Sequence, residues 1–480
     1  MAPNGNGSKI IKLRSREFRI WLAHFGRKSL GKPIIASVLQ TAITTLEGMA
    51  IHESEEHALY MRAASLNGAL WYDLGDGRAV KIDKSGWEVS EKPPILFYRL
   101  QHQKPQVMPV KGGNFGEIFD LLPKPEDGGE RLLLMAWLAT SLMQGFPHPI
   151  LLVHGEKGSR KTTLFKLIRR LIDPSLLETL SPQGDLREFT QQASHNYFLP
   201  LDNLSPIKKP FSNILCRTVT GEGFSKRELF SDDDDVIYSF QRMVGVNGIN
   251  LVLSEPDALD RSVIINLAPP EEYEEDEPLF ARFEAARPRL LGALFDIIVQ
   301  AINQRERLGE IKGLESSRMA GFAKWGYAVT SALGIEAKDF IAALESNKHR
   351  QHDEVMDTSP VASVVAHFME GFIGEWCGTP TTLFADLRRH AEGMKIDPNK
   401  KPFPQSVSWL WKRLEDVIPN LREQGIIVTR DRDNERLIHI AKPGSAAFEG
   451  TTDLGPGGQG YDLGNMPKVE VSNEVEGIPF

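Results

Sequence analysis

The spacing of apolar residues divides this chain into segments of different expected structure. Over residues 14–50 the apolar positions recur at helical intervals, which predicts a pair of helices. Their two stripes comprise Phe18, Trp21, Leu22 and Phe25, then Val38, Ala42, Ile43 and Leu46. Residues 58–100 contain short apolar runs separated by turn signals, and Asp76-Gly77 marks a hairpin between two of them. We therefore expect an α+β domain over residues 1–112.

Beyond this segment the pattern changes twice. Residues 149–350 alternate apolar strands with helical segments, which is typical of a doubly wound α/β core, so we place an α/β domain over 113–350. The polar residues Asn347–Asp357 are interpreted as a linker. Residues 358–442 predict a compact unit of helices closed by a strand pair. Residues 443–480 are rich in glycine and acids and poor in apolar residues, so a disordered tail is expected there.

Composition limits the classes of protein that remain. The chain has 480 residues, 41% of them hydrophobic and 25% charged, as in ordinary globular proteins. Its formal net charge of -8 argues against nucleic acid covering the whole surface, so such contacts need local basic patches. Two cysteines cannot form a disulfide framework, and they fit the reducing cytoplasm. The longest apolar run, near Leu132–Leu142, is too short to span a bilayer, and no membrane association is expected.

A glycine-containing loop joins an expected strand to an expected helix at residues 154–163. Gly155 and Gly158 allow the backbone to curl so that successive N–H groups point at one anion. Lys161 would then reach the β- and γ-phosphates of ATP, and the Thr162 hydroxyl would ligate Mg²⁺. The predicted nucleotide site comprises Gly155, Glu156, Lys157, Gly158, Ser159, Arg160, Lys161, Thr162 and Thr163.

Three further polar residues stand beside later apolar strands. Asp202 ends one such strand, where a second Mg²⁺-organising residue is needed, because the carboxyl ends of the strands face the ligand crevice. Asn247 ends another strand and could orient the attacking water. Each of these two residues is alternatively a simple turn residue. Arg261 comes directly before the apolar strand 262–267.

With these elements in this order, the chain resembles the AAA+ ATPases of the superfamily 3 helicase type. Viruses, phages and integrated mobile elements use such helicases for replication, and the chain also shares features with minichromosome-maintenance helicases. The resemblance implies a P-loop NTPase core with a helical lid. It further implies a homo-hexameric ring that uses ATP and Mg²⁺ to move along single-stranded or forked DNA and unwind it. A primase in a separate chain is an expected partner.

The resemblance also implies a role for each of the polar residues. Lys161 and Thr162 would form motif A, Asp202 motif B, and Asn247 the sensor asparagine. Arg261 would be an arginine finger that reaches the nucleotide of the neighbouring subunit, so an isolated subunit would be nearly inactive. Arg318 would be the sensor arginine of the lid, although a lone arginine on a helix is more often solvated or ion-paired.

Two positions depart from the family pattern. Arg160 stands where the G-x-x-x-x-G-K-[ST] pattern has a glycine. Asn203 stands where many AAA+ proteins carry a glutamate that polarises water, and asparagine cannot act as a base. Hydrolysis that relies on positioning could survive with Asn203 orienting water. The alternative function is an ATP-gated DNA-binding or loading module with little or no unwinding activity.

Two segments are candidates for contact with DNA. A hairpin is expected around residues 221–240, and in the resembling helicases a hairpin at this position enters the central channel. Lys226 and Arg227 would contact DNA there, or would instead pair with the adjacent aspartates. Residues 358–442 fit a winged helix, with one helix starting at Thr379-Pro380 and another opened by Pro404. Its candidate DNA contacts are Lys400, Lys401, Gln405, Ser406, Lys412, Arg413, Arg430, Arg432 and Arg436. The alternative is a protein-contact module whose aromatic residues lie in the core.

Overall fold

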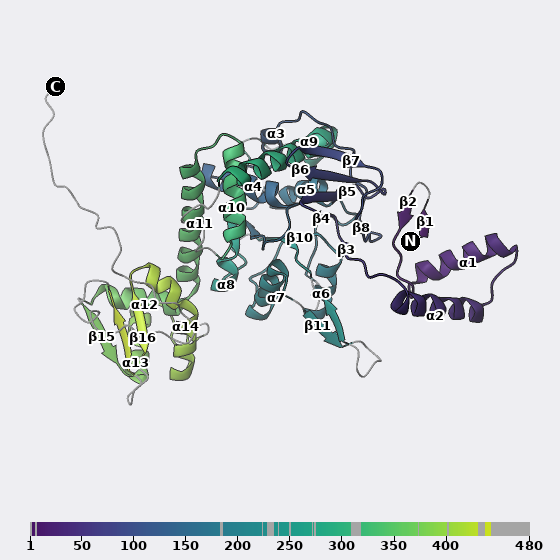
Figure 1. Cartoon of the computed structure of the whole chain (residues 1–480). Helices are drawn as coiled ribbons and strands as arrows, with labels where there is room; N and C mark the ends of the chain where they lie inside the picture. The colour runs from purple at the N-terminus through teal and green to yellow at the C-terminus, as the bar shows by residue number, and fades with distance from the viewer. Residues whose placement is uncertain are drawn as a thin grey trace, which may run out of the picture. The chain divides into compact units, whose positions relative to one another are not determined.

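The computed structural model describes most of the chain. The described residues are 2–4, 7–182, 186–222, 224–227, 235–238, 240–248, 251–270, 272, 275–308, 318–372, 374–400, 403–430 and 437–442. They divide into two compact units, Met1–Thr358 and Ser359–Phe480 (Figure 1). The expected segments 1–112 and 113–350 are therefore not separate compact units. The expected tail, 443–480, lies outside the described residues.

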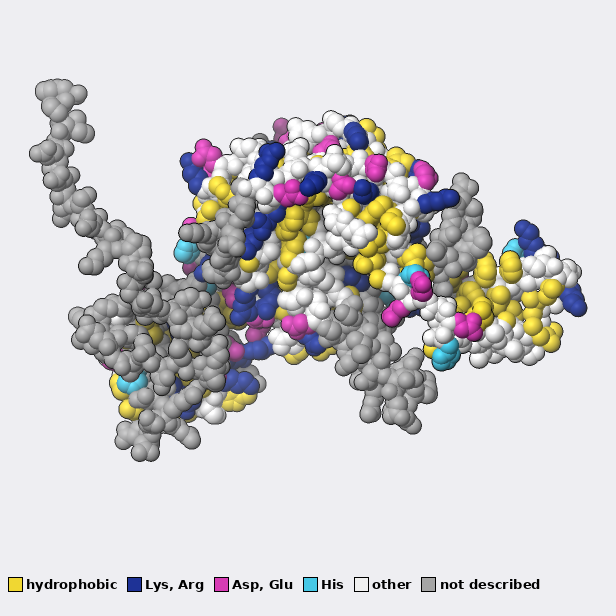
Figure 2. All heavy atoms as spheres, in the orientation of Figure 1, with side chains coloured by type: hydrophobic (Ala, Val, Ile, Leu, Met, Phe, Trp, Pro, Cys, Tyr) yellow, Lys and Arg dark blue, Asp and Glu magenta, His cyan; other side chains and the backbone are white. Residues whose placement is uncertain are grey.

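The first unit begins with a strand pair and a helical hairpin. These elements are β1 (Ala2–Asn4), β2 (Gly7–Lys9), α1 (Arg16–Leu30) and α2 (Ala36–His52). The two helices confirm the prediction for residues 14–50, and the Ser15 hydroxyl caps α1 by accepting from the Phe18 N–H at 3.0 Å. The apolar stripes are only partly buried, because Phe25 and Val38 remain 51% and 52% exposed. Figure 2 shows apolar side chains over this hairpin.

Short strands follow, as the pattern over residues 58–100 predicts, with β3 and β8 paired in parallel and the others antiparallel. They are β3 (Leu59–Tyr60), β4 (Ala63–Leu66), β5 (Ala69–Asp73), β6 (Ala79–Asp83), β7 (Gly86–Ser90) and β8 (Leu96–Phe97). Strands β4 to β7 form one sheet in sequence order, which confirms the hairpin between β5 and β6. This sheet packs against helix α9: the Trp87 indole donates to Asp296 at 2.7 Å and contacts Phe295. That packing joins the strands to the α/β core.

The α/β core contains a four-stranded parallel sheet, as expected from the alternating pattern. Its strands are β9 (Ile150–His154), β10 (Phe198–Leu201), β13 (Met243–Asn247) and β14 (Ser262–Asn266), in the order β10-β13-β9-β14. Around it lie α3 (Phe115–Leu121), α4 (Gly128–Thr140), α5 (Lys161–Ile172), α6 (Leu186–Ser194), α7 (Lys209–Thr220), α8 (Pro256–Leu259), α9 (Asp276–Leu308), α10 (Ala320–Ala332) and α11 (Ala337–Thr358). Pro200 lies in the edge strand β10, where a missing ladder donor is tolerated.

The predicted linker at Asn347–Asp357 is wrong, because these residues belong to helix α11. The Asn347 side chain is buried and accepts from the Ile264 N–H at 2.8 Å while donating to the Ser262 carbonyl at 3.0 Å. The buried Gln351 donates to the same carbonyl at 2.6 Å. Both amides thus supply partners to the edge strand β14, which explains how a polar segment can be buried.

The second unit has the element order of a winged helix. Its elements are α12 (Pro360–Glu370), β15 (Glu375–Gly378), α13 (Pro380–Gly393), α14 (Val407–Glu423), β16 (Ile427–Arg430) and β17 (Ile438–Ala441), and the sheet order is β15-β17-β16. The start of α13 at Thr379-Pro380 agrees with the prediction. Helix α14 begins at Val407, after its N-cap Ser406, three residues later than Pro404 suggested. No helix within the described part of the chain is long and apolar enough to cross a bilayer.

Candidate nucleotide-binding site

The carboxyl ends of three parallel strands bring the predicted polar residues to one edge of the sheet. Val153 of β9 is in register with Asn247 of β13, and Leu201 of β10 is in register with Val246. The loop after β9 and the residue Asp202 after β10 therefore lie beside Asn247. The sequence predicted this convergence from three separate segments.

The loop between β9 and α5 adopts a backbone that only small residues enter easily. Gly155 has φ 143°, and a Cβ there would lie 2.6 Å from the Leu267 carbonyl oxygen. Gly158 has φ 93°. Arg160 has φ 61° and ψ 31°, the left-handed conformation that a glycine adopts without strain. The substitution of arginine for glycine thus leaves the expected backbone conformation in place.

Lys161 and Thr162 open helix α5 and point into this loop region. The Lys161 ammonium donates to the Gly155 and Glu156 carbonyls at 2.7 and 2.8 Å, and to the Ser159 hydroxyl at 3.3 Å. Partial burial lowers the pKa of Lys161, and the nearby Asp202 carboxylate opposes that shift. The lysine is held where an anion entering the loop would exchange with carbonyl oxygens.

Asp202 is the centre of a hydrogen-bond network at the same edge. Its carboxylate accepts from the Thr162 hydroxyl at 2.9 and 3.1 Å and from the Asn247 amide at 2.8 Å. The buried Asn247 in turn accepts from the Asn203 N–H at 2.8 Å, and Asn203 is itself left-handed at φ 55°. A carboxylate beside a hydroxyl is a donor set that suits Mg²⁺. The Asn203 side chain is exposed.

The remaining predicted loop residues take different positions. Ser159 is fully buried, and the Thr163 hydroxyl donates to Asp276 at 3.3 Å. Glu156 and Lys157 are exposed at the loop surface. Of the nine loop residues, these two are the ones whose side chains are least tied to the fold.

Arg261 and Arg318 lie together, but near the amino ends of the strands, whereas the P-loop follows the carboxyl end of β9. The Arg261 carbonyl accepts from the Ile150 N–H at the amino end of β9. The five residues of β14, at about 3.3 Å each, thus place it roughly 16 Å from the P-loop edge. Arg318 shares the Asp257 carboxylate with Arg261 and lies 3.8 Å from Asp260. The structure thus shows Arg318 as an ion-paired residue, and its role as the sensor arginine of the lid stays a prediction.

Asp257 joins these two arginines, and the sequence analysis missed it. Burial would raise its pKa, but hydrogen bonding to Arg261 and the charges of Arg261 and Arg318 outweigh burial and lower it. Burial and the Asp257 charge raise the pKa of the adjacent Cys216 thiol to about 12. The i, i+4 spacing of Asp257 and Arg261 was the available signal.

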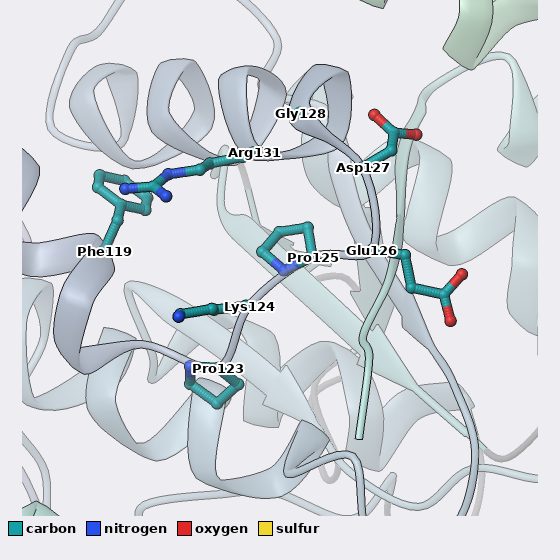
Figure 3. A pocket seen from close by; sticks show the side chains of 8 residues that line it. All are labelled: Phe119, Pro123, Lys124, Pro125, Glu126, Asp127, Gly128 and Arg131. Atoms are coloured by element: carbon teal, nitrogen blue, oxygen red, sulfur yellow. The ribbon is translucent and has the colours of Figure 1, made fainter. Parts of the chain in front are cut away.

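A pocket lies next to the P-loop, on the strand-like segment before α4. Pro125 forms a bridge to Leu267, the residue whose carbonyl closes on Gly155. Figure 3 shows the carboxylates of Glu126 and Asp127 directed away from the basic side chains of the pocket. Its lining residues are Phe119, Pro123, Lys124, Pro125, Glu126, Asp127, Gly128 and Arg131. The sequence carried no motif for this pocket.

The expected hairpin between motif B and Asn247 is present as two antiparallel strands. They are β11 (Phe224–Arg227) and β12 (Asp235–Tyr238). The register sets Lys226 opposite Val236 and Arg227 opposite Asp235. This register keeps both interpretations of Arg227 open, contact with DNA or pairing with an aspartate.

The candidate DNA contacts of the second unit differ in their surroundings. Lys400 is exposed and pairs with Asp397 at 3.2 Å. Gln405 donates to the Phe403 carbonyl at 2.9 Å, and Ser406 caps α14, so both support the local fold. Lys412 and Arg430 lie over the rings of Trp409 and Trp411, and Arg413 is half-buried. Lys401, Arg432 and Arg436 lie outside the described residues.

The expectation that the aromatic residues of α14 are core residues is wrong for one of them. Trp409 is 53% exposed, whereas Leu410 and Leu414 on the same helix are buried. Trp411 is half-buried and donates to Glu415 at 2.5 Å. The core of this unit is aliphatic along α14, which leaves Trp409 at the surface.

The fold and site define a class: an α/β protein with a P-loop-like turn at its parallel sheet, followed by a unit with the element order of a winged helix. Residues 126–349 match the actinomycete integrative conjugative element replication protein family (AICE_RepA), and residues 361–452 match the AICE RepA C-terminal domain. The chain belongs to this family of mobile-element replication proteins.

Two solved structures are similar to the chain. The SCCmec type IV Cch active helicase is 12% identical with a TM-score of 0.46, covering 92% of this chain and 89% of that chain. The NrS-1 C-terminal region in its A form apo structure is 12% identical with a TM-score of 0.38, covering 86% and 91%. A comparison with curated proteins gave no significant match.

Proposed function

We propose that the chain is an ATP-dependent replicative DNA helicase of the AAA+ superfamily 3 type, working as a homo-hexameric ring for a mobile genetic element. One observation carries the proposal. Lys161, Thr162, Asp202 and Asn247 converge at one edge of the sheet, while Arg261 lies at the other. A site divided in this way is complete only when two subunits meet.

Each subunit would hold ATP by its own P-loop. Lys161 would leave the loop carbonyls for the β- and γ-phosphates, and the N–H groups around Gly158 and the start of α5 would bind the same oxygens. Thr162 and Asp202 would hold Mg²⁺, whose positive charge would stabilise the negative charge that develops as the phosphoryl group is transferred. Asn247, fixed on Asp202, would orient the attacking water.

The neighbouring subunit would supply the arginines. Arg261 is separated from its own P-loop by the length of β14, roughly 16 Å, so it would serve the site of a neighbouring subunit. Arg318 shares the Asp257 carboxylate with it and would therefore face the same neighbour. Triphosphate oxygens would compete with Asp257 for both guanidinium groups.

The base of the nucleotide would enter the pocket beside Leu267. Phe119 offers an aromatic ring, and Lys124 and Arg131 offer donors. Pro125 of this pocket forms a β-bridge to Leu267, whose carbonyl lies close to Gly155 of the P-loop. This nearness to the P-loop supports the assignment.

DNA would be bound in two places. Lys226 and Arg227 on the β11–β12 hairpin would follow the strand inside the ring, and basic residues of the winged-helix unit would make the first contact. The match to a family of replication proteins supports DNA as the partner.

The alternative function is an ATP-gated DNA-binding or loading module. Asn203 favours it, because the position after Asp202 carries an exposed amide and no base. This module would bind ATP and assemble but unwind little DNA.

The experiment is ATP turnover with and without single-stranded DNA. Lys161→Ala should lower turnover about 100-fold or more, because a charge that stabilises the transition state is lost. Lys84→Ala is the matched control, since it removes an exposed lysine in the turn after β6, outside the P-loop, and should leave turnover unchanged. Equal turnover in wild type and Lys161→Ala would refute the ATPase. Slow turnover that DNA does not stimulate would favour the loading module.

A further inference from the structure

An exposed tryptophan stands at the start of the second unit's longest helix. Trp409 is the third residue of α14, follows the N-cap Ser406, and is 53% exposed. The Lys412 ammonium lies 5.4 Å from the centre of its ring, one turn further along the same face. An exposed indole with a cation over it is an unusual surface feature, since large aromatic residues are normally covered.

The second tryptophan of the helix shows that Trp409 is not simply one of two equivalent residues. Trp411 is held by its hydrogen bond to Glu415 and by Arg430 at 4.9 Å over its ring. Its donor and its ring are both engaged within the fold. Trp409 therefore carries the aromatic surface that α14 presents to solvent.

The charges along α14 decide which nucleic acid fits this surface. The first two turns combine the positive end of the helix dipole with Lys412 and the half-buried Arg413, whereas Glu415 and Asp416 follow on the third turn. A duplex lying along the helix would bring its phosphates against those two carboxylates. A single strand crossing only the first turns would avoid them.

The chemistry of an indole leads to the same conclusion. Aromatic side chains bind nucleic acid by stacking on the face of an unpaired base, and this face is covered by neighbouring bases in a duplex. Duplex recognition by a helix relies instead on polar side chains that reach base edges in the major groove. Trp409 offers a ring face and only one N–H.

We propose that the first turns of α14 form a binding site for single-stranded DNA, in which an unpaired base stacks on Trp409 and the adjacent phosphate binds Lys412. This proposal rests on the proposed function, because it assumes that the chain acts on DNA. In this proposal α14 captures an unpaired strand and does not enter the major groove of a duplex. The winged-helix unit would then hold DNA that is already open.

The test measures binding of the full chain to a fluorescein-labelled dT15 strand and to a 15-base-pair hairpin, without nucleotide. Trp409→Ala should weaken binding to dT15 about fivefold or more and change hairpin binding less than about twofold. Trp409→Phe keeps a ring, so it should retain most of the affinity but lose the quenching of tryptophan emission that dT15 causes. Phe25→Ala, which removes an aromatic residue that is 51% exposed in the other unit, should change nothing.

Lys412→Ala adds an independent measurement, since it should reduce the salt dependence of dT15 binding by a slope of about 0.7. Unchanged dT15 affinity in Trp409→Ala would overturn the proposal, and equal losses for dT15 and hairpin would indicate a duplex site instead. Neither of those results touches the proposed function if DNA still stimulates ATP turnover. A wild-type chain that binds neither DNA and is not stimulated would refute both.

Discussion

Replacing Asn347 by alanine should destabilise the α/β core, because its amide is the partner of the edge strand β14. Ile264 is buried, with 1% of its surface exposed, so its N–H would lose its only side-chain acceptor without gaining water. Leaving a buried N–H unpaired costs about 1–3 kcal/mol. The Ser262 carbonyl keeps Gln351 as a donor, so losing the second bond costs only about 1 kcal/mol. The higher helix propensity of alanine returns about 0.5 kcal/mol. We expect a net loss of about 2–3 kcal/mol in the free energy of unfolding.

Equilibrium urea unfolding measures that loss, and hydrogen exchange of the Ser262–Asn266 amides locates it. Gln351→Ala should cost about 1 kcal/mol, since Asn347 still serves the same carbonyl. Ser346→Ala, an exposed change on the same helix, should stay within about 0.5 kcal/mol. If Asn347→Ala costs no more than Ser346→Ala, the polar residues of α11 do not support β14 and the reasoning fails.

Two further predictions concern the nucleotide pocket and the thiols. Arg131→Ala should weaken ATP binding about three- to tenfold, because a cation beside the base is lost, and should leave binding of inorganic triphosphate unchanged. Calorimetry with both ligands measures the two affinities. Equal losses for ATP and triphosphate would contradict the base pocket. The pKa of Cys216 is raised to about 12, so its thiolate is absent at pH 8. Ellman's reagent should therefore react with the exposed Cys377 in the folded chain and with both thiols in urea. Prompt reaction of Cys216 in the folded chain would contradict its burial beside Asp257.

The sequence predicted the nucleotide edge well because its residues follow strands. Asp202 and Asn247 each end a buried apolar run, and in a parallel sheet such ends must meet at one edge. Local pattern and sheet geometry were sufficient there. The sequence marked Arg160 only as a departure from the glycine pattern, and its left-handed backbone came from the structure.

Other features depend on contacts that no local pattern carries. Asn347 is polar and yet buried, because its partners are backbone groups of a strand more than 80 positions earlier. Arg318 lies beside Arg261 because both contact Asp257, and the position of a helix relative to a sheet edge is not written in either segment. Trp409 resembles a core residue in sequence, and only the aliphatic packing of α14 leaves it exposed.

The division of the site between two subunits is tested most directly by mixing two inactive variants. Lys161→Ala lacks the P-loop lysine and Arg261→Ala lacks the arginine at the opposite edge, so each should be nearly inactive alone. In mixed rings, an interface formed by an intact P-loop and an intact Arg261 should recover ATP turnover, with native mass spectrometry showing mixed hexamers. Arg217→Ala, which removes an arginine of α7, is the control that should be active alone. Mixed assemblies without any recovery, or a chain that hydrolyses ATP as a monomer with Arg261 absent, would contradict the account.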